Sequence, residues 1–82
     1  MSKGSHLETL CFELEALKQV LISQQNIRGI YWDGYQKEFA KSNAHGFHGQ
    51  ACFSVWKEYQ FNHIPRTNRM IAALEWSMEQ LT

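Results

Sequence analysis

Five leucines near the start of the chain recur at alternating intervals of three and four residues. Because an α-helix turns once in 3.6 residues, this spacing places all five on one narrow stripe of a helix surface. Ser5 followed by Glu8 forms a capping box, which predicts a helix start at this point and a helix over about residues 6–25. The stripe consists of Leu7, Leu10, Leu14, Leu17 and Leu21.

The leucine stripe has two interpretations. In the first, the helix packs on the rest of its own domain. In the second, the stripe is the seam of a homodimer, as in a short coiled coil. The polar Gln24 ends the stripe before it reaches the length of an extended coiled coil, which favours packing within the domain.

The length and the composition bound the class of protein. A chain of 82 residues has enough apolar surface for one small core, so we expect residues 1–82 to form a single domain. Cys11 and Cys52 lie in apolar runs without a secretory signal before them, which predicts reduced cysteines in a cytoplasmic protein. No apolar run approaches the roughly 18 residues of a membrane helix. The net charge of zero argues against binding dominated by nucleic-acid phosphates.

The segment 27–35 has two interpretations. Asp33-Gly34 between aromatic residues is typical of a β-hairpin turn. However, Ile27, Tyr31 and Tyr35 are spaced by four, which is the spacing of one helix face, and helix-favouring residues follow. We expect a helix over about residues 28–42, weakened by its two glycines.

The rest of the chain predicts two further helices. The glycine-rich residues 42–49 are typical of a flexible joint, and apolar spacing indicates a helix over about residues 50–62. Pro65 is expected to end that helix and to start another over 65–81, because proline disfavours helix in the residue before it and suits a first turn. The fold class predicted is therefore all-α, a compact bundle of about four short helices.

One group of residues has the side chains that zinc prefers. Imidazole nitrogen and thiolate sulfur occur together at His45, His48 and Cys52, with His63 further along. The spacing is loose and contains no CxxC or HExxH pair, so histidines in a loop and a small core cysteine are the favoured explanation of the group. No phosphate-binding loop, dinucleotide fingerprint or nucleophile elbow is present, and Cys52 with a histidine is the one conceivable catalytic pair. We therefore expect no cofactor and no enzymatic activity.

The segment 62–71 resembles the turn and recognition helix of helix-turn-helix proteins. The resemblance implies that the residues from Arg66 to Arg69 face DNA bases and phosphates. The chain departs from the pattern at His63, where a glycine is expected, and at the bulky Tyr59, where a small residue is expected. The alternative is an ordinary helix start capped by Thr67. The residues of the DNA-binding interpretation are Arg66, Thr67, Asn68 and Arg69.

Aromatic residues are dense between positions 31 and 61. Four short helices have limited interior, so some of these rings are expected at the surface, where Trp and Tyr beside basic residues are typical of protein-binding hot spots. Trp76 is a further candidate for exposure. The candidate partner-binding residues are Arg28, Trp32, Tyr35, Lys37, Trp56 and Lys57.

These patterns together favour a small interaction or regulatory protein. It is expected to act by binding another protein, as an adaptor or as an inhibitor of the kind that phages and mobile elements carry, or to form a homodimer. The alternatives are a DNA-binding regulator that uses Arg66 to Arg69 and a small metal-binding protein.

Overall fold

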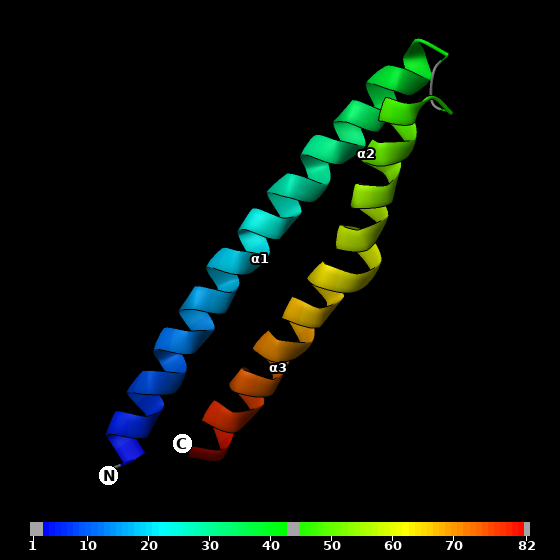
Figure 1. Cartoon of the computed structure of the whole chain (residues 1–82). Helices are drawn as coiled ribbons and strands as arrows, with labels where there is room; N and C mark the ends of the chain where they lie inside the picture. Colours follow the sequence, from blue (N-terminus) through cyan, green and yellow to red (C-terminus); the bar gives the residue numbers. More distant parts are fainter. Residues whose placement is uncertain (1–2, 43–44, 82) are drawn as a thin grey trace.

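The chain forms an antiparallel helical hairpin (Figure 1). The computed structural model describes residues 3–42 and 45–81. The first arm is one helix, α1 (Lys3–Ala40). The second arm runs without a break through α2 (Phe47–Glu58), the π-helical turn η1 (Tyr59–His63) and α3 (Ile64–Leu81). The described residues contain helices and no strand, as the all-α prediction requires.

The molecule is a rod, and the prediction of a compact bundle of about four short helices is wrong. Its dimensions are 60 × 15 × 14 Å and its radius of gyration is 18.0 Å. A compact chain of this length would have a radius of gyration of about 12 Å. The helices expected over 6–25 and 28–42 are one helix, and those expected over 50–62 and 65–81 belong to one continuous arm.

The first arm passes through both of its glycines as a helix, so segment 27–35 is not a β-hairpin. Gly34 has a packing reason to be glycine, because a Cβ atom there would lie 3.0 Å from Cys52 Sγ of the second arm. Contacts between α1 and the second arm offset the helix stability that the two glycines cost. The helix begins at Lys3, so the predicted helix start at Ser5 is wrong. After Ala40 the chain turns at Ser42, whose φ of 58° is left-handed, as is common just past a helix end.

The side of α1 that faces the second arm extends the leucine stripe. Partly buried positions continue on the same side beyond Leu21, at Gln24, Arg28, Tyr35 and Glu38, with intervals of three, four, seven and three residues. The prediction that Gln24 ends the stripe is therefore wrong. The reason is that buried polar groups are tolerated when they are hydrogen-bonded. The Thr67 hydroxyl donates to Gln24 Oε1 at 2.7 Å.

The turn η1 inserts one extra residue into the second arm. Its signature is the Ile64 N–H, which donates to the Tyr59 carbonyl five residues back. Before η1 the inward positions include Cys52 and Tyr59; after it they are Ile64, Thr67, Ile71, Leu74, Met78 and Leu81. A heptad repeat counted from Cys52 and Tyr59 reaches position 66, which is one residue short of Thr67, the position reached by counting back from Leu74. The inserted residue absorbs that difference, so both segments face α1.

The prediction that Pro65 ends a helix is wrong. Pro65 lies in the first turn of α3, directly after η1. Proline inside a regular α-helix costs about 3 kcal/mol, because it has no N–H to donate and its ring collides with the carbonyl four residues back. A π turn already interrupts the regular bonding pattern at this point, so the arm continues through the proline.

Two helices can enclose only a thin core. The buried apolar residues are Leu10, Cys52, Ile64 and Ile71, and no large side chain among the described residues is fully buried. Neither arm, over the residues described, has a stretch long and apolar enough to cross a membrane. The rod thus leaves much of its apolar surface open to contact.

Candidate protein-binding surface

Six aromatic rings from both arms form one cluster in the half of the rod nearer the turn. The two tryptophans lie at its centre, with the Trp32 and Trp56 ring centroids 4.8 Å apart. Phe53 stacks on Trp56 at 5.6 Å and lies 5.1 Å from Tyr35. Spacings of three and four residues bring the rings of α1 and of α2 to adjoining faces, and Phe61 of η1 joins them five residues after Trp56. The aromatic cluster consists of Trp32, Tyr35, Phe39, Phe53, Trp56 and Phe61.

The outer rings of the aromatic cluster face solvent. Phe39 and Phe61 are 63% and 68% exposed, while Tyr35 and Trp56 are half-buried beneath them. Trp56 meets Phe61 edge to face, with centroids 5.9 Å apart. Two helices cannot enclose six rings, because each ring has up to about 250 Å² of surface. The cluster is therefore both an internal contact and an exposed apolar surface.

The structure brings together part of the predicted partner-binding set. Trp32, Tyr35 and Trp56 lie in the aromatic cluster, and the Lys57 ammonium lies 5.9 Å from the Phe53 ring centroid. The other two predicted residues lie elsewhere, for different reasons.

Arg28 is turned into the hairpin, where its Nη1 donates to Gln60 Oε1 at 2.7 Å. Lys37 follows Tyr35 by two residues, so it projects from the other side of α1. Sequence reasoning did not select Phe39, Phe53 or Phe61. A signal existed for two of them, because Phe39 follows Tyr35 by four residues and Phe53 precedes Trp56 by three.

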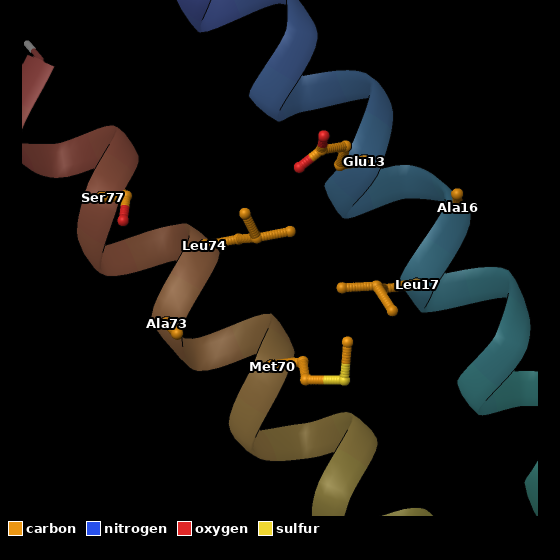
Figure 2. A pocket seen from close by; sticks show the side chains of 7 residues that line it. All are labelled: Glu13, Ala16, Leu17, Met70, Ala73, Leu74 and Ser77. Atoms are coloured by element: carbon orange, nitrogen blue, oxygen red, sulfur yellow. The ribbon is translucent and has the colours of Figure 1, made fainter.

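The half of the rod nearer the termini has an apolar groove between α1 and α3. Its volume is about 520 Å³. Figure 2 shows Leu17 of α1 and Leu74 and Met70 of α3 pointing toward one another across it. Its lining residues are Glu13, Ala16, Leu17, Met70, Ala73, Leu74 and Ser77.

The five stripe leucines are used inside the hairpin. Leu10 is buried, and the other four are partly buried on the side of α1 that faces the second arm. In this structure the leucine stripe therefore packs within its own domain. A homodimer through the same leucines would require the two arms to separate.

The histidine and cysteine group does not converge as a metal site. Among the described residues, no three His, Cys, Asp or Glu side chains are arranged to hold a metal ion. Cys52 Sγ lies 3.7 Å from His48 Nε2, and the same nitrogen lies 4.0 Å from Glu38 Oε1. His45 lines a different hollow beside Phe53. Cys52 is buried against Gly34, so no open site stands over its sulfur.

The turn of a helix-turn-helix is missing. Residues 59–81 continue as one arm through the position where that turn was expected. Thr67 is buried and bonded to Gln24, so it cannot face a base. Arg66 Nη2 donates along its own helix to Asn62 Oδ1 at 3.2 Å. The geometry implied for Arg66, Thr67, Asn68 and Arg69 is therefore wrong.

Comparisons with protein-family models, with curated proteins and with solved structures gave no match for this chain. The chemistry of the surface itself must therefore indicate function. The described residues expose the rings of Phe39 and Phe61 at the edge of the aromatic cluster, and aromatic side chains are enriched at protein interfaces.

Proposed function

We propose that this protein is a helical-hairpin module that binds another protein through the aromatic cluster. The observation that carries the proposal is the continuous contact of six rings from both arms, with Phe39 and Phe61 open to solvent at its edge. In this role the protein acts by binding and not by catalysis, as an adaptor or a regulator.

The composition and rigidity of the surface support a protein partner. Aromatic side chains dominate the energetics of protein interfaces, because they bury a large area and have few rotatable bonds to immobilise. Here the rings also brace one another, so the surface is already ordered before binding and loses less conformational entropy. Lys57 beside Phe53 adds a positive charge at the rim, which favours a partner with acidic residues around an apolar centre.

The test compares the wild type with two phenylalanine variants as immobilised baits that capture proteins from a lysate of the native host. The wild type and the Phe39→Ala/Phe61→Ala double variant are immobilised at equal density, and the lysate is applied both with and without nuclease treatment. Both rings lie at the exposed edge of the cluster, so the hairpin is expected to keep its helix content. The double variant is expected to retain at least about tenfold less of a stoichiometric protein, since hot-spot aromatics contribute about 2 kcal/mol or more each.

Phe12→Ala is the matched control. Phe12 is exposed on α1, outside the aromatic cluster, so this variant should retain as much partner as the wild type. Equal loss in the control and in the double variant would contradict the proposal. So would retention that depends on nucleic acid and disappears with nuclease.

A further inference from the structure

A second apolar stripe runs along the outside of α1. Its residues recur at intervals of four and three, as the leucines do, but they lie on a different side of the helix. Val20 and Ile30 are exposed, and Ala16 also lines the apolar groove, so stripe and groove form one continuous face. This outer stripe consists of Ala16, Val20, Ser23, Ile27 and Ile30.

The exposed area of the rod exceeds that of a compact monomer of the same mass by about the area that one interface buries. The chain exposes 6037 Å², whereas the size scaling for folded monomers gives about 5,100 Å² for a mass of 9.6 kDa. The excess is about 900 Å². A stable protein–protein interface of standard size buries about 800 Å² on each partner. One face-to-face contact would therefore bring this chain to the surface area of an ordinary folded protein.

Charged residues at the two ends of the outer stripe favour a second copy of the chain as the binding partner, with its α1 helix antiparallel. Glu13 lies just before the stripe and Lys37 just after it, and both are exposed. Two copies of α1 side by side in parallel would place Glu13 beside Glu13 and Lys37 beside Lys37. Antiparallel copies place Glu13 of one beside Lys37 of the other, and two-fold symmetry makes the same pair twice.

We propose that a second copy of this chain covers the outer stripe, with the two α1 helices antiparallel and in the register that pairs Glu13 with Lys37. In this register Val20 lies opposite Ile30 of the second copy and Ser23 lies opposite Ile27. The apolar pairs occupy the centre and the charged pairs the rim, which is the arrangement of known interfaces. This interface is on a different face from the leucine stripe and from the aromatic cluster.

The first test measures mass in solution with a matched pair of variants. Sedimentation equilibrium of the wild type is expected to give twice the 9.6 kDa chain mass. Val20→Glu is expected to raise the dimer dissociation constant at least about tenfold, because it places a carboxylate in the apolar centre. Ile22→Glu is the control: the two side chains are 44% and 48% exposed, but Ile22 points away from the outer stripe. It is expected to leave the constant unchanged.

The second test addresses direction and register. Glu13→Lys and Lys37→Glu are each expected to raise the dissociation constant about fivefold, because each places like charges together at both ends of the interface. The double reversal restores opposite charges and is expected to return the constant to within about twofold of the wild type. Circular dichroism of every variant confirms that the helices are intact.

Three results would overturn the proposal. They are a wild type that stays monomeric up to millimolar concentration, equal weakening by Val20→Glu and Ile22→Glu, and failure of the double reversal to restore association. The Phe39→Ala/Phe61→Ala variant should keep the wild-type mass, so failure of the aromatic surface as a binding site and failure of this dimer are distinguishable.

Discussion

Both halves of the rod pack two helices through residues spaced by three and four, but the side chains at those positions differ. The surfaces of the two halves differ as a result. Near the turn, large rings such as Trp32 and Trp56 fill the seam and overflow it, which leaves a raised aromatic surface. Near the termini, leucines such as Leu17 and Leu74 meet across the seam, and small neighbours leave a groove (Figure 2). The volume of the side chains at equivalent positions thus decides whether a pair of helices presents a protrusion or a hollow.

Polar residues form the boundary between the two halves, and the register of the second arm against α1 changes there. The Thr67–Gln24 and Arg28–Gln60 hydrogen bonds cross the hairpin near η1, where the inward face of the second arm shifts by one residue. Polar pairs at such positions fix which residues lie opposite one another, because slipping by a turn would leave buried polar groups without partners. The following variants test this division, with all unfolding free energies compared at one protein concentration.

The largest effect is expected from deleting Phe61, which removes the extra residue of η1. The two segments of the second arm would then differ by about 100° in the direction they face, and Pro65 would fall in a regular helix at a cost of about 3 kcal/mol. We expect a loss of at least about 3 kcal/mol in urea unfolding followed by circular dichroism. Phe61→Ala keeps the residue count and is expected to lose about 1 kcal/mol, for its contact with Trp56. Similar losses in the two variants would show that the register shift is unimportant.

The next effect compares one tryptophan from each half. Trp56 is half-buried and contacts three other rings, so Trp56→Ala is expected to lower the unfolding free energy by about 2 to 3 kcal/mol. Trp76 of the terminal half is largely exposed, and Trp76→Ala is expected to change it by less than about 0.5 kcal/mol. Thermal and urea unfolding measure both. An equal loss at the two positions would remove the distinction between the halves.

A smaller effect is expected at the polar boundary. Thr67 is buried, and its hydroxyl lies 2.7 Å from Gln24 Oε1 and 3.1 Å from the His63 carbonyl oxygen. Thr67→Val keeps the shape and leaves the Gln24 side chain without this partner, at a cost of about 1 to 2 kcal/mol. Gln24→Leu/Thr67→Val removes both partners and is expected to recover the loss. A double variant as unstable as the single one would show that the bond does not account for the cost.

The smallest effects have opposite signs at the two glycines of α1. A Cβ at Gly29 meets nothing within 4 Å, so Gly29→Ala is expected to stabilise the protein by about 0.5 to 1 kcal/mol through helix propensity. A Cβ at Gly34 would lie 3.0 Å from Cys52 Sγ, so Gly34→Ala is expected to destabilise it by about 1 kcal/mol. Melting temperatures of the two variants resolve the difference. A shift in the same direction at both glycines would argue against the close contact of Gly34 with Cys52.

Sequence patterns determined the local structure of this protein. The interval of the leucines is enough to predict a helix with one apolar side, and the spacing of Tyr31 and Tyr35 correctly favoured helix over hairpin. The aromatic density was also visible, and a small helical domain has too little interior to bury every ring. These inferences succeed because helical periodicity depends on neighbouring residues along one chain.

Only the tertiary structure decided where the helices end and which residues meet. Glycines at 29 and 34 and a proline at 65 normally weaken or interrupt helices, yet here both arms continue through them, because packing along the seam and the π turn before Pro65 offset the cost. The partners of Gln24 and Arg28 are more than thirty residues away in the sequence, so no local pattern could identify them. Two long arms instead of four short helices are the result, since packing energy along the whole seam exceeds the local propensity to break.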